Sequence, residues 1–261
     1  MSDIERIADY LLELRLSHRT VPLFPAELLP GDEATAYRVQ DRLTEKLLPT
    51  LGPIVGYKIG LTSEAIRRQT GLDHPIVGPI FQKRVFKTPA SLPLSSFGRL
   101  GLELELCVRL GKELPASGAP YTEDSVAEAV SGIGTAFELI EDHGADYGRL
   151  NAMQLIADGS WQSGVLVAPP VAAWRDRDRF NAPGWVTIDG KETARGKAGD
   201  AMGQCFSGLA WTANQLAPLG RSLQAGMIVM TGSIVPTQFP KQGNTVVGTI
   251  EGFGEISLTL T

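Results

Sequence analysis

The stretch Gly101-Leu102-Glu103-Leu104-Glu105-Leu106-Cys107-Val108 alternates two glutamates with apolar residues. Successive side chains of a β-strand point to opposite faces, so we expect Glu103 and Glu105 on one face and the leucines on the other. Two carboxylates at that spacing repel each other unless a cation lies between them or water separates them. A strand with one solvated face would give the same pattern, so this stretch alone leaves both interpretations open.

A third acid lies in a similarly apolar stretch, Ala136-Phe137-Glu138-Leu139-Ile140. Burying an unpaired carboxylate between apolar neighbours costs free energy, which favours a role shared with the first two glutamates. Mg²⁺ and Mn²⁺ prefer oxygen ligands and keep coordination positions open for a substrate. We therefore expect Glu103, Glu105 and Glu138 to hold a hard divalent cation, Mg²⁺ or Mn²⁺.

The composition indicates a soluble protein with a substantial core. The chain has 261 residues, of which 43% are hydrophobic and 20% charged, and this size fits one large domain or slightly more. The net charge is −5 and no run of Lys or Arg forms a basic stripe, so we expect no nucleic-acid partner. We find no apolar run of spanning length and no signal-like start, so we expect no membrane partner and a cytoplasmic location. Cys107 and Cys205 lie among apolar residues and are expected to be buried free thiols.

Periodicity divides the chain into two parts. Apolar residues at helical spacing predict helices over residues 3–17 and 33–48, followed by a short strand over 54–59 and a helix near 63–70. Strand-like runs dominate the rest, and two helices interrupt them near residues 122–130 and 203–217. The expected strands span residues 101–110, 133–141, 161–168, 184–189, 226–232, 244–250 and 254–260. We therefore predict an α+β fold, with a helical N-terminal part over residues 1–70 and a β-rich catalytic body over residues 71–261.

Several polar residues could serve a site in such a body. Lys58 ends an apolar strand between glycines, where it could transfer protons, although a surface lysine with a buried stem would look the same. The hydroxyls and amides of Thr231-Gly232-Ser233 could bind a carboxylate, or could form an ordinary turn. His143 could titrate within a site or lie at the surface, and His74 is expected in a loop.

In chain order, these motifs resemble the 2-keto-4-pentenoate hydratase and 2-oxo-3-hexenedioate decarboxylase group of the fumarylacetoacetate hydrolase superfamily. The resemblance covers residues 4 to 260, approximately, and the ordered set of motifs is more specific than any single one. The motifs are Gly56-Tyr57-Lys58-Ile59-Gly60-Leu61-Thr62-Ser63, Glu103-Leu104-Glu105, Ala136-Phe137-Glu138, Ile156-Ala157-Asp158, Gly208-Leu209-Ala210-Trp211-Thr212-Ala213-Asn214, and Leu223-Gln224-Ala225-Gly226 through Thr231-Gly232-Ser233.

The resemblance implies a mixed β-roll body, a cation on the three glutamates and a homo-oligomer. It implies a small 2-oxo or 2-hydroxydienoate acid as substrate, and proton transfer assisted by Lys58. The site residues expected on this basis are Lys58, His143 and Asp158 as catalytic residues, and Thr62, Ser63, Thr231 and Ser233 as substrate-binding residues.

Three departures from the family pattern bear on the reaction. Ile76 occupies the place where hydratases of the family commonly carry an aspartate, and an isoleucine cannot orient or deprotonate water. Glu141-Asp142-His143 replaces Asp-Ser-Arg, and Gly159 replaces the asparagine of an Asp-Asn pair. Asp142 and His143 are candidates to replace the missing acid.

These departures leave the reaction open at this point. We expect a metal-dependent lyase of hydratase type, with a 2-oxo-3-enedioate decarboxylase as the alternative. An acylpyruvate C–C hydrolase that uses His143 or His74 as base, and a non-catalytic binding subunit, are further alternatives.

Overall fold

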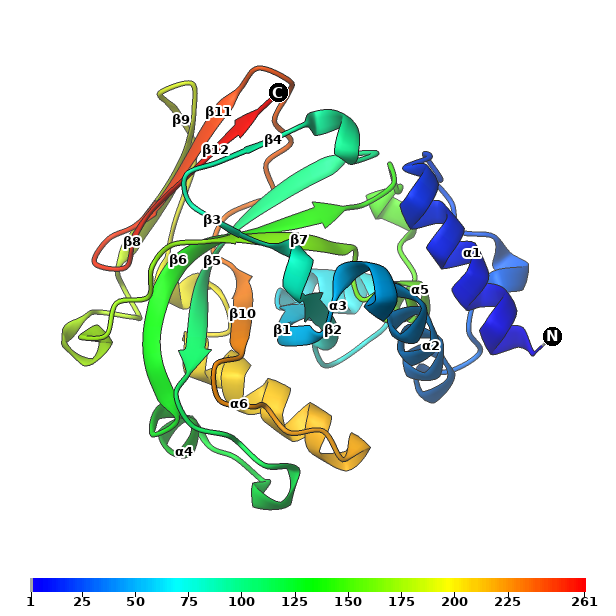
Figure 1. Cartoon of the computed structure of the whole chain (residues 1–261), viewed down its shortest axis with the longest axis horizontal. Helices are drawn as coiled ribbons and strands as arrows, with labels where there is room; N and C mark the ends of the chain where they lie inside the picture. Colours follow the sequence, from blue (N-terminus) through cyan, green and yellow to red (C-terminus); the bar gives the residue numbers. More distant parts are fainter. Residues whose placement is uncertain (1) are drawn as a thin grey trace.

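Two mixed β-sheets form the centre of the structure, a computed structural model that describes residues 2–261 (Figure 1). The strands of the larger sheet are, in spatial order, β2 (Ile76–Phe81), β1 (Ile54–Gly60), β10 (Ile228–Ser233), β5 (Leu100–Leu110), β6 (Val130–Glu141), β7 (Gln162–Val167) and β3 (Val85–Lys87). Those of the smaller sheet are β4 (Ala90–Leu92), β12 (Gly254–Leu260), β11 (Thr245–Ile250), β8 (Pro183–Ile188) and β9 (Lys191–Lys197). The expected α+β fold, with a β-rich body and N-terminal helices, is confirmed.

The long antiparallel pair β5 and β6 separates the core from the face that carries the acids. Leu102, Leu104 and Leu106 are at most 1% exposed, as the alternation predicts. Leu104 lies opposite Phe137 in the pairing, and both contact β11 at Gly248, where an added Cβ would lie 2.6 Å from the phenylalanine ring. The apolar face of β5 and β6 therefore packs against the smaller sheet, and the glutamates face the other way.

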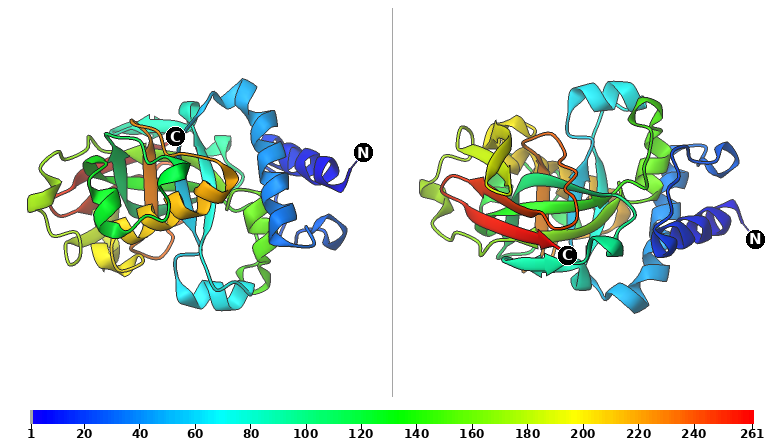
Figure 2. Two further views of the ribbon diagram at one scale, coloured as in Figure 1. Left: turned by 90° about the horizontal axis from the view of Figure 1, so that it is seen from below. Right: turned by 90° about the horizontal axis from the view of Figure 1, so that it is seen from above.

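The helices gather mainly at one end of the molecule and below the larger sheet (Figures 1 and 2). They are α1 (Asp3–Ser17), α2 (Glu33–Leu51), α3 (Glu64–Thr70), α4 (Glu123–Ala127), α5 (Ala152–Ala157) and α6 (Cys205–Leu216). Short 3₁₀ helices occupy several connections, among them η5 (Tyr147–Arg149). The Ser2 side chain accepts a hydrogen bond from the Glu5 backbone N–H at 3.3 Å, so α1 begins at the cap that the sequence predicts.

The sequence prediction missed the shorter elements. Strands β2, β3, β4 and β9 and helix α5 were not expected, and α4 is shorter than the predicted helix near residues 122–130. β1 pairs with β2 and, in parallel, with β10, so the N-terminal seventy residues contribute a strand to the larger sheet. The division of the chain near residue 70 stays a prediction.

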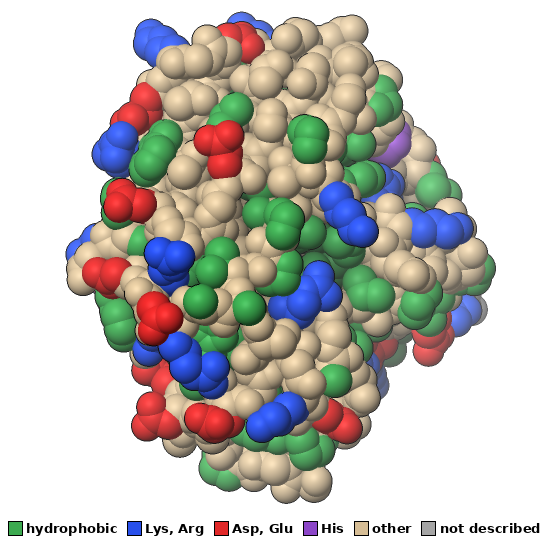
Figure 3. All heavy atoms as spheres, turned by 60° about the vertical axis from the view of Figure 1, so that its left-hand side comes forward, with side chains coloured by type: hydrophobic (Ala, Val, Ile, Leu, Met, Phe, Trp, Pro, Cys, Tyr) green, Lys and Arg blue, Asp and Glu red, His purple; other side chains and the backbone are tan. Residues whose placement is uncertain are grey.

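The surface carries charges of both signs. On the face drawn in Figure 3, Lys and Arg side chains are interspersed with Asp and Glu rather than arranged as a stripe of one sign. Among residues 2–261 there is no helix with the length and apolar character needed to cross a membrane.

Candidate active site

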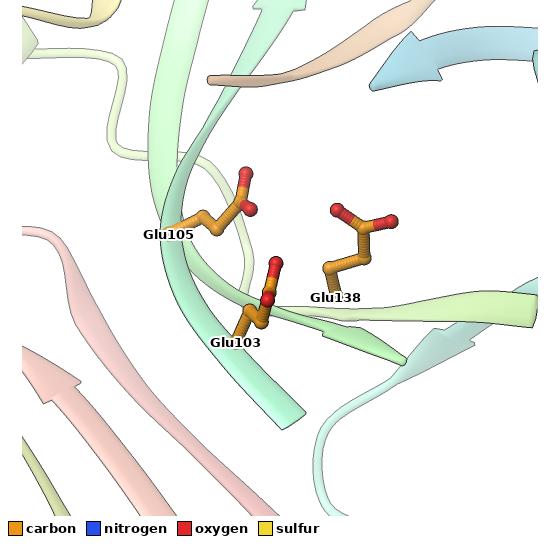
Figure 4. A group of neighbouring side chains, drawn as sticks. All are labelled: Glu103, Glu105 and Glu138. Atoms are coloured by element: carbon orange, nitrogen blue, oxygen red, sulfur yellow. The ribbon is translucent and has the colours of Figure 1, made fainter. Parts of the chain in front are cut away.

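Glu103, Glu105 and Glu138 converge on one point of the larger sheet (Figure 4). Glu103 lies directly opposite Glu138 in the pairing of β5 with β6, and Glu105 lies two residues along the same face. Each offers a carboxylate oxygen, and these oxygens all lie within 4.8 Å of one another. The alternative of an ordinary solvated face is wrong for this strand, because Glu105 and Glu138 are fully buried.

Hydrogen-bond donors of the protein pair with only some of the carboxylate oxygens. Glu105 Oε2 accepts a hydrogen bond from the Gly232 backbone N–H at 2.8 Å, and Glu103 Oε1 accepts one from the Thr237 hydroxyl at 2.7 Å. Within residues 2–261, Glu105 Oε1 and Glu138 Oε2 have no hydrogen-bond partner. Buried carboxylate oxygens without partners are costly, so the cluster has unused capacity to bind a cation.

Burial and mutual repulsion shift the protonation of the cluster. Burial raises the pKa of Glu105 well above its usual range, and the negative charges of Glu138 and Glu103 raise it further. Burial also raises the pKa of Glu138 to about 7, although the Lys58 ammonium opposes that rise. Three oxygen donors at this separation, two of them buried and short of partners, suit a hard divalent cation such as Mg²⁺ or Mn²⁺.

A bulge in β10 provides the backbone N–H that donates a hydrogen bond to Glu105. The pairing of β10 with β5 shifts between Met230 and Ser233, where Gly232 has a φ of 104°. This conformation favours glycine, and an added Cβ would lie 2.6 Å from a carbon of Thr62. The Thr231-Gly232-Ser233 motif is therefore a bulge that aims a backbone N–H at Glu105.

Lys58 is buried beside the acids. Its side chain is 2% exposed, and Nζ lies 2.9 Å from Glu138 Oε1. Nζ also donates a hydrogen bond to the Ser160 carbonyl at 2.8 Å. Ser160 and Trp161 both have positive φ values, 55° and 61°, a sparsely populated conformation that turns this carbonyl toward the lysine. The alternative of a surface lysine is wrong.

A cavity of about 310 Å³ opens next to Lys58 and Glu103. Its wall is mainly apolar, and a few hydroxyl groups lie near the glutamates, as in many sites for small organic molecules. The lining residues are Lys58, Ile59, Gly60, Leu61, Thr62, Ser63, Ile66, Glu103, Ile140, Tyr147, Leu150, Leu155, Ser160, Trp161, Ser233, Val235, Pro236 and Thr237.

The structure brings some of the expected substrate-binding residues to this cavity. Thr62, Ser63 and Ser233 line it. Thr231 does not, because it is buried and donates its hydroxyl to the Leu106 carbonyl at 2.8 Å. The Ser233 hydroxyl donates to the Val235 carbonyl at 2.7 Å, which leaves its oxygen lone pairs free to accept.

His143 and Asp158, the other expected catalytic residues, are buried and make other contacts. Asp158 is 2% exposed, and Arg15 of α1 donates from Nε to its Oδ1 at 2.8 Å. His143 is 3% exposed, with Nδ1 3.8 Å from Glu141 Oε1, and burial lowers its pKa although Asp158 and Glu141 oppose this. Neither residue lines the cavity, and their catalytic roles stay predictions.

Three further residues escaped the sequence prediction. Tyr147 and Trp161 line the cavity from the segments that flank α5, with ring centroids 5.7 Å apart, and Thr237 contacts Glu103 from the loop after β10. All three lie outside the motifs that carried the resemblance. Pro236, three residues after Ser233, was a weak signal that this loop takes part.

Comparison with known proteins assigns the chain to a family. Residues 72–261 match the family model described as the C-terminal region of fumarylacetoacetate (FAA) hydrolase. This chain belongs to the fumarylacetoacetate hydrolase family. Among curated members, the 2-keto-4-pentenoate hydratase of Burkholderia vietnamiensis (strain G4 / LMG 22486) is 30% identical over 269 residues, with both chains covered completely. The 4-oxalocrotonate decarboxylase of Pseudomonas sp is 26% identical, over 99% of this chain and 98% of that protein.

A solved structure supports the same fold. The 4-oxalocrotonate decarboxylase from Pseudomonas putida G7, complexed with magnesium and adipate, superposes with a TM-score of 0.91. The superposition covers 99% of this chain and 97% of the decarboxylase chain, and the two sequences are 21% identical. A second structure of that decarboxylase is complexed with calcium and acetate and has a TM-score of 0.90. At this identity the similarity establishes the fumarylacetoacetate hydrolase fold, including its N-terminal helices.

Proposed function

We propose that this chain is a divalent-metal-dependent lyase that adds water to a 2-hydroxy-2,4-dienoate. The observation that carries the proposal is the cluster of Glu103, Glu105 and Glu138, whose oxygens lie within 4.8 Å of one another beside a cavity. The full-length similarity to 2-keto-4-pentenoate hydratases supports the same reaction class. The cavity of about 310 Å³ accommodates a small organic acid.

The three glutamates are proposed as the metal ligands, with Mg²⁺ or Mn²⁺ as the ion. The magnesium and calcium complexes of the structural relative support a divalent cation. Such an ion would act as a Lewis acid toward the carboxylate and 2-oxygen of the substrate. Gly232 and Thr237 would hold Glu105 and Glu103 in place through their hydrogen bonds.

Other residues of the chain are proposed to bind and protonate the substrate. Lys58 is poised to exchange a proton with the substrate carbon skeleton, because its ammonium lies at the cavity wall beside Glu138. Thr62, Ser63 and Ser233 offer hydroxyl groups to the substrate carboxylate. The apolar wall of Ile66, Leu150, Leu155, Trp161 and Val235 would surround the hydrocarbon end.

Decarboxylation of a 2-oxo-3-enedioate is the second candidate, and Ile76 is the observation that favours it. Ile76 is fully buried on β2 opposite Gly60, so no acid lies where a family hydratase commonly has one. An apolar wall around a terminal carboxylate would favour the loss of its charge as CO₂. Acylpyruvate hydrolysis receives no such support, because neither His74 nor His143 is among the residues that line the cavity.

Two assays on the same purified protein separate the candidates. Hydration is followed as the loss of the ultraviolet band of 2-hydroxypenta-2,4-dienoate, and decarboxylation as CO₂ release from 2-oxo-3-hexenedioate. Each is measured with Mg²⁺, with Mn²⁺ and with a chelator. We expect metal-dependent hydration. CO₂ release without hydration would assign the chain to the second candidate. A protein without saturable binding of either ion would favour the alternative of a non-catalytic binding subunit.

A homo-oligomer and a cytoplasmic location are proposed as well. The family resemblance supports the first. The two free, buried cysteines accord with a reducing compartment. Light scattering of the purified protein would measure the oligomeric mass.

A further inference from the structure

Asp142 and Tyr147 form a hydrogen-bonded pair in which only Tyr147 lines the cavity. Asp142 is 1% exposed and follows directly after β6. Its Oδ1 accepts a hydrogen bond from the Gly144 backbone N–H at 2.9 Å, and its Oδ2 accepts one from the Tyr147 hydroxyl at 3.0 Å. Arg99 Nη1 lies 3.6 Å from the same Oδ2. Asp142 is therefore a buried base with a single side-chain hydroxyl as donor.

Tyr147 connects this base to the cavity. The residue lines the cavity together with Lys58 and Glu103, and the Trp161 ring packs against its own. Burial, followed by the charge of Asp142 and the hydrogen bond to it, raises the pKa of Tyr147, and the charge of Glu103 adds to the rise. The phenol thus keeps its proton at neutral pH and directs that proton to Asp142, while its oxygen can still accept a hydrogen bond.

The other polar side chains of the cavity either contact other protein groups or have no neighbouring carboxylate that could accept a proton from them. The Lys58 ammonium contacts Glu138 and the Ser160 carbonyl. Thr237 donates to Glu103, and Ser233 donates to a backbone carbonyl. Among the described residues that line the cavity, Tyr147 alone donates its hydroxyl to a carboxylate outside the three glutamates.

We propose that Tyr147, held by Asp142, orients and deprotonates the water that adds to the substrate, in place of the acid absent at Ile76. The inference rests on the proposed hydratase function. The water oxygen forms a bond to C4 as the C3–C4 double bond of the 2-oxo-3-enoate tautomer breaks. One water proton passes to Tyr147 Oη while the phenolic proton passes to Asp142 Oδ2, and the Lys58 ammonium gives the proton that bonds to C3. The proton held by Asp142 and the one lost by Lys58 balance, and exchange with solvent restores both groups. Asp142 acts through Tyr147 and is a positioning and proton-accepting residue.

The test separates the water step from the rest of the reaction. Tyr147→Phe keeps the ring against Trp161 but removes the hydroxyl. We expect hydration of 2-hydroxypenta-2,4-dienoate to fall by about 10²–10⁴-fold in kcat, the usual contribution of general acid–base catalysis. Tautomerisation, measured by NMR as exchange of carbon-bound protons into deuterated solvent, requires no attacking water and should stay within about twofold. Mg²⁺ affinity, measured by calorimetry, should not change.

A second variant and two controls make the result specific. Asp142→Asn cannot accept the proton, so it should lose hydration and keep exchange as Tyr147→Phe does, and the double variant should lose no more than either alone. Tyr121→Phe removes a hydroxyl that donates to the Pro115 carbonyl at 2.7 Å, and Asp178→Asn changes an exposed acid bonded to backbone N–H groups. Both controls should hydrate at the wild-type rate.

The outcomes distinguish this inference from the function on which it rests. Wild-type protein that exchanges protons or releases CO₂ without hydrating would overturn the hydratase function itself. Wild-type hydration that survives in Tyr147→Phe would overturn the role of Tyr147 alone. An equal fall of hydration and exchange in Tyr147→Phe would mean that the hydroxyl only shapes the cavity, and would also overturn the inference.

Discussion

Glu105→Gln should stabilise the metal-free protein and abolish its stabilisation by a divalent cation. The substitution preserves side-chain shape and removes one charge from a cluster whose oxygens lie within 4.8 Å of one another. With an effective dielectric constant of about 20, two unit charges at that distance repel by about 3.5 kcal/mol. Two of the three pairwise repulsions involve Glu105, and its buried Oε1 has no partner within residues 2–261. Without metal at pH 8, the variant should be more stable than the wild type by at most about one such repulsion, because the raised pKa of Glu105 already lowers its charge in the wild type.

With metal, the wild type should gain far more stability than the variant. A cation at 100 times its Kd stabilises the wild type by about 2.7 kcal/mol, which for a chain of this size corresponds to a rise in Tm of roughly 5–10 °C. The variant, with one ligand neutralised, should show almost none of that rise. Thermal unfolding by circular dichroism at pH 8, with a chelator and then across a Mg²⁺ titration, measures both effects.

A matched control is Glu255→Gln, which removes a charge from an exposed position of β12. It should follow the wild type at every Mg²⁺ concentration. If Glu105→Gln gains as much Tm from Mg²⁺ as the wild type does, the three glutamates do not bind the ion together and the proposed site is refuted.

Four further measurements address other parts of the structure. Lys58→Met keeps the buried stem but removes the ammonium beside Glu138, so turnover should fall by about 10²–10⁴-fold while calorimetry still detects Mg²⁺ binding; a fully active variant would exclude proton transfer by this residue. Burial raises the pKa of Glu138 from 4.5 to about 7, so the folded state binds that proton more tightly than the unfolded state does. The contribution of Glu138 to the stability of the metal-free protein should therefore be fully present below pH 4.5 and be lost, by about 3 kcal/mol, as the pH rises to 7. Urea unfolding of the wild type and of Glu138→Gln at a series of pH values would measure it, and identical pH profiles would contradict the shift. Gly78→Ala would place a Cβ 2.4 Å from a backbone carbonyl in the loop after α5 and should cost about 1–3 kcal/mol in urea unfolding, whereas Gly31→Ala, with no atom within 4 Å, should cost little. Burial raises the pKa values of both cysteines to about 12, so a thiol reagent should label the folded protein slowly and the unfolded protein rapidly. Fast labelling of folded Cys205→Ser would show that Cys107 is accessible.

The sequence predicted the elements whose periodicity is long and regular. The alternation around Glu103 and Glu105 gave the strand, the buried leucine face and the shared acidic face, all of which the structure confirms. Helix α1 spans the predicted residues, because its cap and its apolar spacing indicate the same start and end. β2 was missed because Ile76–Phe81 is buried on both faces and contains Gly78 and Pro79, so it shows neither alternation nor an uninterrupted β-branched run.

The site was less predictable than the fold, because its partners are set by tertiary contacts. The convergence of the three glutamates follows from strand pairing, whereas the position of Asp158 depends on Arg15, 143 residues away in the chain. Tyr147 could not be found by motif, since its place at the cavity follows from a hydrogen bond to Asp142 across an irregular turn. Local patterns indicate the face on which a side chain lies, but they do not indicate which distant backbone will meet it.

The parallel pairing of β1 with β10 aligns Tyr57 with Val229, so the lysine strand and the strand before the Ser233 loop come from opposite ends of the chain. A ribosome must therefore release nearly the whole polypeptide before β1 and β10 can pair and form the cavity. Nascent chains and C-terminal truncations would be inert whatever helices they had already formed. Enzymatic turnover would then indicate that synthesis and folding are complete. A slow step in pairing β1 with β10 would delay activity without delaying the helical circular dichroism signal.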